Sequence, residues 1–148
     1  MELDLKFQVQ TKIQKPVADV FDAVYNPDKL SAYFTTGGAS ARLDPGTTVM
    51  WAFAEPPVDD FPVYVKEVEM NKSIAFEWDH GDEKYYRVEI EFEALSANET
   101  LIKISEGGWP ATERGLEQSY GNCEGWTHML ACMKAYVEYG INLRRGSH

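Results

Sequence analysis

Residues 125–145 read Gly-Trp-Thr-His-Met-Leu-Ala-Cys-Met-Lys-Ala-Tyr-Val-Glu-Tyr-Gly-Ile-Asn-Leu-Arg-Arg, and this stretch decides the fold. Its apolar residues recur at steps of four, three, four and four positions, which is the spacing of one stripe on an α-helix. The stripe consists of Trp126, Leu130, Met133, Val137 and Ile141. Most of the preceding chain has the pattern of strands. A long amphipathic helix at the end of a β-rich chain predicts a sheet that bends around one helix.

The composition is that of one globular domain spanning residues 1–148. Hydrophobic residues make up 44% and charged residues 26%, and the net charge is -10. We expect no binding to nucleic acid or to an anionic membrane, because phosphates repel such a chain. The first residues lack the pattern of a signal peptide, and no run approaches the ~20 apolar residues of a membrane span. We therefore expect a cytoplasmic protein, as a monomer or a weak homodimer.

Two cysteines, Cys123 and Cys132, lie nine positions apart. On a continuous helix this separation corresponds to about 13 Å along the axis, whereas a disulfide requires Cα atoms within about 7 Å of each other. We therefore expect two free thiols.

The first part of the chain predicts one strand followed by two short helices. Apolar and polar residues alternate over residues 3–13, as on a strand with one buried face. Pro16 fits the first turn of a helix, and helical spacing of apolar residues continues to Val24. Asn26 is placed to cap a second helix over residues 27–35.

The middle of the chain predicts about six strands joined by short turns, which is typical of an antiparallel meander. Their approximate ranges are 39–43, 49–53, 61–68, 74–78, 87–93 and 101–105. Residues 55–60 contain two prolines and are predicted to form a loop, and residues 79–82 a polar turn. Residues 107–110 are predicted to end the last strand. A short helix is then expected over 112–119, and glycines leave its connection to the long helix open.

The predicted order is one strand, two helices, about six strands and a long helix, which is an α+β fold. In this order the chain resembles the helix-grip fold of the START-like superfamily, also called SRPBCC. Within it the chain is most similar to the family of activators of the heat-shock chaperone ATPase. The segments that carry the resemblance are residues 16–24, 30–35 and 44–46, and Gly125-Trp126 with the helix after it. The resemblance implies that a curved antiparallel sheet grips the C-terminal helix.

The resemblance leaves three functions open, because fold alone does not determine function. The first, which we favour, is binding of a small hydrophobic ligand between sheet and helix, without a cofactor. The second is binding to a partner protein such as the heat-shock chaperone, as part of a stress response. The third is a cyclase-like enzyme of the polyketide type, although the sequence shows no nucleophile or phosphate-binding motif.

Bulky residues at positions expected to face the helix are the candidate ligand contacts. Aromatic rings on a curved sheet can leave a gap, and apolar cavities with few polar groups are the usual ligand sites. The alternative is that the same residues fill the core. The candidates are Phe34, Trp51, Phe53, Phe76, Trp78 and Phe92, together with Trp126, Leu130 and Met133 on the long helix.

His128 has Glu124 and Cys132 one helical turn away on either side. The spacing is not that of a known metal site, so we expect no metal there. We expect His128 to point away from the sheet, because it lies about 200° around the helix from Trp126.

The remaining ionisable residues give weaker signals. Glu89, Glu91 and Glu93 alternate along one strand and are expected on its solvent face, where like charges stay hydrated. Tyr33 and Glu55 are inward candidates for acid–base chemistry, but neither has a predicted partner. The sequence therefore predicts no catalytic residue.

Overall fold

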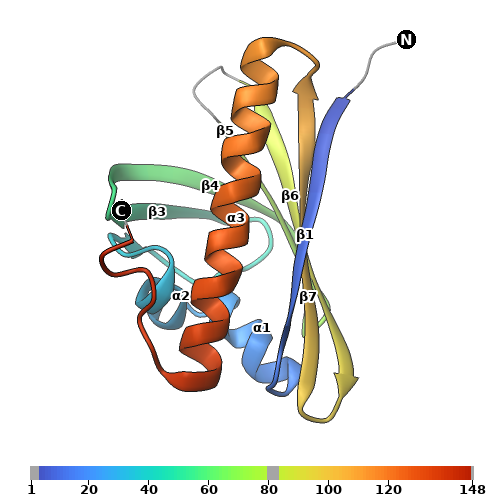
Figure 1. The fold of residues 1–148 in the computed structure, drawn as a ribbon, viewed down its shortest axis with the longest axis vertical. Coiled ribbons are helices and arrows are strands. Elements are labelled where there is room, and N and C mark those ends of the chain that lie inside the picture. The colour runs from blue at the N-terminus through green and yellow to red at the C-terminus, as the bar shows by residue number, and fades with distance from the viewer. Residues whose placement is uncertain (1–3, 80–83, 148) are drawn as a thin grey trace.

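The computed structural model describes residues 4–79 and 84–147 (Figure 1). A seven-stranded antiparallel sheet carries one long helix on one face, and two short helices lie near the end of that helix. The elements are β1 (Asp4–Ile13), α1 (Val17–Tyr25), α2 (Pro27–Tyr33), β2 (Gly38–Ala39), β3 (Thr48–Ala54), β4 (Pro57–Glu69), β5 (Ser73–Asp79), β6 (Tyr85–Ser96), β7 (Glu99–Pro110) and α3 (Glu113–Tyr139). The α+β fold predicted from the sequence is confirmed. Most of the turn predicted at residues 79–82 lies outside the described residues.

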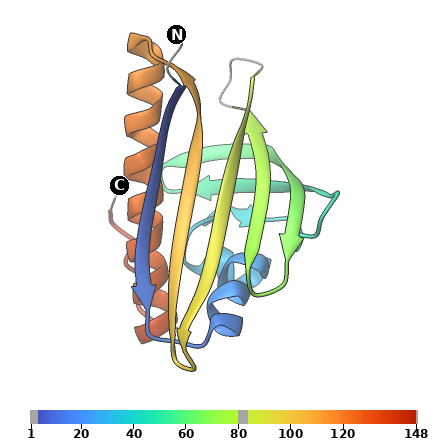
Figure 2. The ribbon, with the colours of Figure 1, turned by 90° about the vertical axis from the view of Figure 1, so that its right-hand side faces the viewer.

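The strands follow the order β1-β7-β6-β5-β4-β3-β2. The strands from β2 to β7 therefore form the predicted meander. Its last strand, β7, also pairs with β1, the first strand of the chain. The sheet is twisted, so that β1 and β7 run along α3 whereas β3 and β4 cross it and extend beyond it (Figures 1 and 2). This divergence leaves part of the sheet beside α3 without a covering helix.

The two short helices form where the sequence predicts them. The side chain of Asn26 accepts a hydrogen bond from the main-chain N–H of Asp28 at 3.0 Å, which caps α2. Val20, Phe21 and Val24 bury one side of α1. The buried sides of α1 and α2 therefore cover the end of the core that α3 and the sheet leave open.

The long helix is longer at its beginning and shorter at its end than predicted. Thr112 caps it by accepting a hydrogen bond from the N–H of Gly115 at 3.1 Å, and the helix then continues unbroken for 27 residues. The expected short helix over 112–119 and the tail helix are therefore one element. Gly140, at φ 68°, ends it in the left-handed conformation. Ile141 lies past this end and is exposed, so its assignment to the buried stripe is wrong.

Three predicted strand boundaries also need correction. β4 begins at Pro57, because a proline is tolerated at the first position of a strand, so the predicted loop over 55–60 is mostly strand. β7 continues to Pro110, past the predicted break. A Cβ at Gly107 would lie 2.7 Å from the Cβ of Lys6 on β1, so glycine permits the close pairing there. Conversely, of the strand expected over 39–43 only Ala39 lies in β2, which consists of Gly38–Ala39 and pairs with β3.

The core lies between the sheet, α3 and the two short helices. Trp51 is its central side chain, with ring contacts to Phe34, Phe76 and Trp78. Aromatic side chains therefore fill much of the space that the curved sheet encloses.

Two sequence predictions of a different kind can be compared with this fold. Cys123 and Cys132 are both free thiols, as expected. No helix in the described part of the chain is long and apolar enough to cross a membrane.

Replacement of Leu130 by alanine tests the packing of α3. Leu130 is completely enclosed on the sheet side of the helix, so Leu130→Ala should lower the free energy of unfolding by about 2–5 kcal/mol. Ile141→Ala is the matched control from the same predicted stripe, with an expected change within about 0.5 kcal/mol. Urea denaturation of both variants measures the difference, and equal effects would contradict the observed end of the helix.

Candidate functional site

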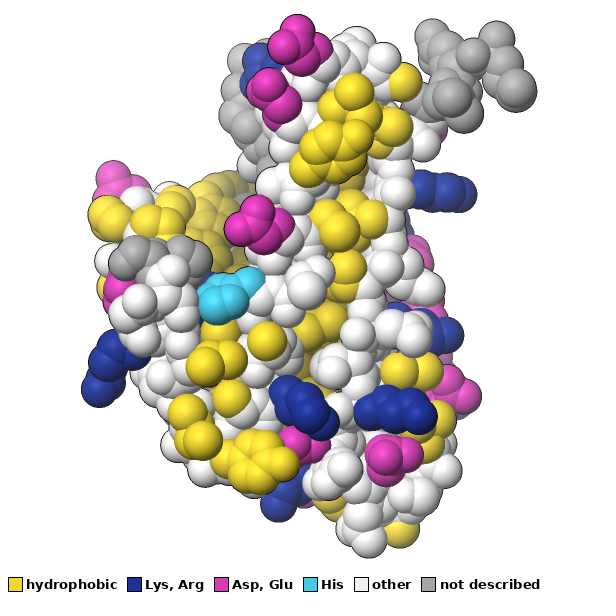
Figure 3. Space-filling model, in the orientation of Figure 1, with side chains coloured by type: hydrophobic (Ala, Val, Ile, Leu, Met, Phe, Trp, Pro, Cys, Tyr) yellow, Lys and Arg dark blue, Asp and Glu magenta, His cyan; other side chains and the backbone are white. Residues whose placement is uncertain are grey.

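An open groove lies beside the first half of α3, where β3 and β4 extend past the helix. Its volume is about 1180 Å³. Figure 3 shows hydrophobic side chains recessed in the hollow between α3 and the β3–β4 end of the sheet. The chain that follows α3 forms the remaining border. The residues that line it include Phe34, Phe53, Pro56, Val58, Trp78, Asn122, Cys123, Glu124, Trp126, His128, Ala131, Arg144 and Ser147.

Four aromatic rings form a continuous wall of the groove. Trp126 on α3 contacts Trp78 from β5, with ring centroids 5.4 Å apart, and Phe34 at 5.5 Å. Phe34 also meets Phe53 from β3 edge to face at 5.1 Å. Phe53 and Trp78 are half-buried, whereas Phe34 and Trp126 are buried. The wall is thus a partly exposed extension of the aromatic core.

The buried carboxylate of Glu106 fixes two of these rings. Glu106 lies on β7 and is only 2% exposed. The indole Nε1–H of Trp78 donates to its Oε2 at 2.7 Å, and the indole Nε1–H of Trp126 donates to its Oε1 at 3.0 Å. The amide of Asn122 donates to the same Oε1 at 3.0 Å. A single carboxylate therefore joins the sheet to the helix and sets the orientation of both indoles.

Sequence reasoning missed Glu106, although a signal was present. Ile102 and Ile104 point into the core, and strict alternation places Glu106 on the same face. The prediction ended this strand one residue earlier, because the glycines that follow were interpreted as a break. A carboxylate in phase with two inward isoleucines is the pattern that would have identified it.

Arg144 is the second buried charged residue at the groove, and it lies in an irregular segment where no sequence period indicates burial. Its guanidinium lies 5.1 Å from the ring centroid of Phe53 and 5.8 Å from that of Phe34. Nη2 donates to the main-chain carbonyl oxygen of Glu55 at 3.1 Å, whereas the buried Nε has no hydrogen-bond partner. Burial lowers the pKa of Arg144, but an arginine stays charged at neutral pH. This residue anchors the chain after α3 to the β3–β4 turn.

His128 lines the groove and is half-buried. Its Nε2 is 3.5 Å from the Sγ of Cys132, which is completely buried and whose pKa is raised by that burial. Cys132 is thus covered on the side of α3 that faces Tyr33 and Arg144, whereas Glu124 and Ala131 on the outer side of the helix are exposed. Within residues 4–79 and 84–147, no group of three His, Cys, Asp or Glu side chains is arranged to hold a metal ion.

The predicted ligand contacts fall into two groups. Phe34, Phe53, Trp78 and Trp126 line the groove. Trp51, Phe76, Leu130 and Met133 are enclosed in the core, and Phe92 packs against Phe21 on α1 at 5.2 Å. The structure therefore brings the first four together at one surface, and their contact with a ligand stays a prediction.

The two inward candidates for acid–base chemistry do not form a pair. Tyr33 is completely buried, which raises its pKa well above the ordinary value, and its hydroxyl donates to the carbonyl oxygen of Ala23 at 3.0 Å. Glu55 meets Arg144 through its main-chain oxygen. Tyr33 is therefore a structural residue that stays protonated at neutral pH.

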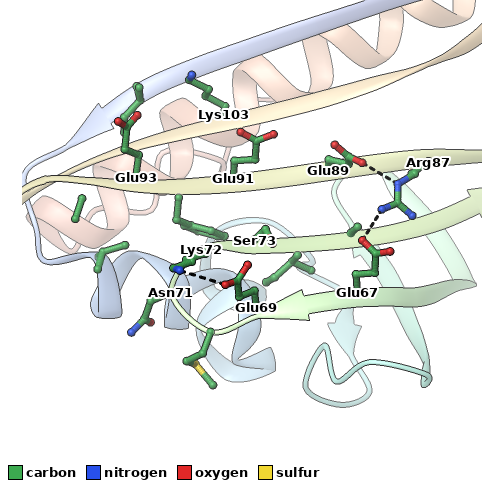
Figure 4. Close-up of a pocket in the computed structure, with 17 residues that line it drawn as sticks. Glu67, Glu69, Asn71, Lys72, Ser73, Arg87, Glu89, Glu91, Glu93 and Lys103 are labelled. Carbon is green, nitrogen blue, oxygen red and sulfur yellow. Dashed lines mark hydrogen bonds and ion pairs between the residues drawn. The ribbon is translucent and has the colours of Figure 1, made fainter.

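The opposite face of the sheet carries a polar depression of about 830 Å³ across β4, β5 and β6 (Figure 4). Arg87 bridges Glu67 at 2.9 Å and Glu89 at 2.8 Å, and these contacts, mainly that with Glu89, raise its pKa. Glu91 and Glu93 are exposed, which confirms the predicted solvent face of this strand. Such exposed ion pairs contribute little to stability or recognition.

Comparison with known proteins identifies the family. The model of the family described as Activator of Hsp90 ATPase homolog 1-like protein (AHSA1) matches residues 14–138. The chain belongs to the AHSA1 family. None of the curated proteins matches the sequence significantly.

Solved structures of other proteins share the fold of this chain. The Staphylococcus saprophyticus protein SSP2350 is 26% identical, with a TM-score of 0.80 over 95% of this chain and 96% of that one. The Aha1 dimer from Colwellia psychrerythraea is 16% identical, with a TM-score of 0.74 over 92% and 98% of the two chains. A Bacillus halodurans protein, BH1534, is 17% identical, with a TM-score of 0.73 over 93% and 99%. At the identities of the latter two, the likeness shows the AHSA1 fold alone.

Replacement of Glu106 by glutamine tests the link between sheet and helix. The amide nitrogen of glutamine cannot accept a hydrogen bond, so at least one indole N–H would stay buried without a partner. Glu106→Gln should therefore lower the free energy of unfolding by about 1–3 kcal/mol. It should also change the near-ultraviolet circular dichroism of the tryptophans.

The matched control is Glu91→Gln on the exposed face of the neighbouring strand β6. Its expected effect is within about 0.5 kcal/mol. An unfolding free energy for Glu106→Gln as high as that of the control would contradict the proposed link.

Proposed function

We propose that this chain binds small, largely apolar molecules in the groove beside α3. The observation that carries the proposal is the wall of four aromatic rings, which continues the core outward into a groove of about 1180 Å³. Sites for small molecules are concave, mostly apolar and furnished with a few polar groups. Asn122, His128 and Arg144 supply such groups here.

The fixed orientation of the wall favours binding. Two of its rings are held by hydrogen bonds to Glu106, and Phe53 lies under the guanidinium of Arg144. A ligand that stacks on these rings would not have to order them first, and preorganisation of this kind increases affinity. Contact with the half-buried faces of Phe53 and Trp78 would remove apolar surface from water.

Filling the groove tests the proposal directly. N-Phenyl-1-naphthylamine is a neutral aromatic probe whose fluorescence rises in apolar surroundings, and we expect it to bind the wild-type chain. Ala131 is exposed on α3 at the groove, so Ala131→Trp should occupy the site and weaken probe binding by about tenfold or more, or ~1.4 kcal/mol.

The control for this experiment is Ala18→Trp, at an exposed position of α1 that does not border the groove. It should change the probe affinity by less than about twofold. Absence of probe binding to the wild type, or equal binding to the wild type and Ala131→Trp, would refute the groove as the binding site.

A second candidate function is binding to a partner protein, the heat-shock chaperone for which the family is named. The supporting observation is a pair of exposed apolar residues, Leu116 and Tyr120, one turn apart on the first half of α3. Figure 3 shows hydrophobic side chains at the outer surface of this part of the helix. Exposed apolar clusters are common at protein interfaces.

The chaperone ATPase provides the test of this second candidate. The chain should increase ATP hydrolysis by an Hsp90-type chaperone, and the double variant Leu116→Ser/Tyr120→Ser should not. Tyr139→Ser, an exposed tyrosine at the other end of α3, is the control that should keep the effect. An unchanged ATPase rate with the wild-type chain would exclude this function.

A further inference from the structure

We propose that Arg144 makes the groove selective for apolar molecules that carry an oxyanion, in the first instance a carboxylate. This inference rests on the function proposed above and adds the chemical class of the ligand. It depends on the position of the Arg144 side chain, which borders the groove although the residue is only 6% exposed.

Arg144 lacks a directly paired counter-charge within residues 4–79 and 84–147. In the described part of the chain, Arg144 forms no ion pair within 4.0 Å of a carboxylate, although the charge of Glu55 acts on it from a longer distance. One N–H group donates to the main-chain oxygen of Glu55, and the buried Nε donates to no atom. Burial of a cation is costly unless the cation is paired and hydrogen-bonded, and Arg144 lacks partners among the described residues that would fully offset this cost. An anionic group in the groove would supply such a partner.

The shape of the Arg144 side chain also suits a carboxylate. A guanidinium presents its N–H groups in a planar fork that matches both oxygens of a carboxylate. Its positive charge lies over the rings of Phe53 and Phe34, which are themselves part of the groove wall. The anionic group and the apolar body of a ligand would therefore contact adjacent parts of one surface.

The other charged groups near the groove leave Arg144 as the local cation. Glu106 lies behind the tryptophans, and its oxygens accept three N–H groups. Glu124 is exposed at the border, where water screens it. His128 also lines the groove. The net charge of -10 opposes the preference of Arg144 for anions, because it attracts cations to the whole surface.

These opposing effects give a test on the wild-type chain. Decanoate and decyltrimethylammonium have the same apolar chain length and opposite charge, and the neutral comparison is decan-1-ol. Displacement of N-phenyl-1-naphthylamine measures all three below their micelle concentrations. We expect decanoate to bind about tenfold more tightly than the cation, although the net charge favours the cation. Equal binding, or preference for the cation, would overturn the inference.

A variant then assigns the preference to Arg144. Arg144→Gln should weaken decanoate binding by about tenfold and leave decan-1-ol within about threefold. Arg145→Gln is the matched control, because it removes the same charge from the adjacent exposed position and should affect neither ligand. Equal weakening of decanoate and decan-1-ol by Arg144→Gln would show that Arg144 only supports the fold, and would overturn the inference.

The two proposals fail in different ways. If decan-1-ol binds and decanoate shows no advantage over the cation, the groove is a binding site without selectivity for anions. If the probe binds but none of the three ligands displaces it, the selectivity is refuted, whereas absence of probe binding refutes both the site and its selectivity. The comparison of ligands on the wild-type chain does not depend on whether the variants fold.

Discussion

The carboxylate of Glu106 holds the sheet and the long helix in one register. It accepts N–H groups from Trp78 on β5 and from Trp126 and Asn122 on α3, in a place that water does not reach. A buried carboxylate of this kind needs all of its hydrogen bonds, so any shift of α3 along the sheet would be penalised. Apolar packing alone would tolerate such a shift more easily. The geometry of the aromatic wall therefore follows from one polar contact.

The groove itself follows from the twist of the sheet. α3 covers β1 and β7 along its length, but β3 and β4 turn away and extend past it (Figures 1 and 2). The chain after Gly140 folds back toward this uncovered part, and Arg144 anchors it to Glu55. The core aromatic cluster is thus accessible at the groove. The same arrangement that stabilises the helix on the sheet creates the proposed ligand site.

The sequence was sufficient for the architecture because the architecture depends on repeated patterns. Alternation in β1 and the stripe that contains Trp126, Leu130 and Met133 report directly which faces are buried. The sequence predicted the limits of the long helix less well. Gly121 and Gly125 suggest a break in the helix, but tertiary packing keeps the helix continuous through both residues.

Repeated sequence patterns do not predict where the polar residues of the site lie. Glu106 was missed where the strand prediction stopped too early, and Arg144 lies in an irregular segment where no period reports burial. His128 is half-buried at the groove, and its angle around the helix from Trp126 does not report that position. Contacts between segments distant in sequence decided each of these positions, and a single sequence does not report such contacts.

The indole N–H resonances of the four tryptophans report whether a small apolar molecule binds in the groove. Titration of the ¹⁵N-labelled chain with N-phenyl-1-naphthylamine should shift the signals of Trp78 and Trp126, because both rings line the groove. Trp109, which packs against Phe7 and Tyr86 and does not border the groove, should keep its position. Unchanged signals of Trp78 and Trp126 at saturating probe, or an equal shift of Trp109, would contradict the account.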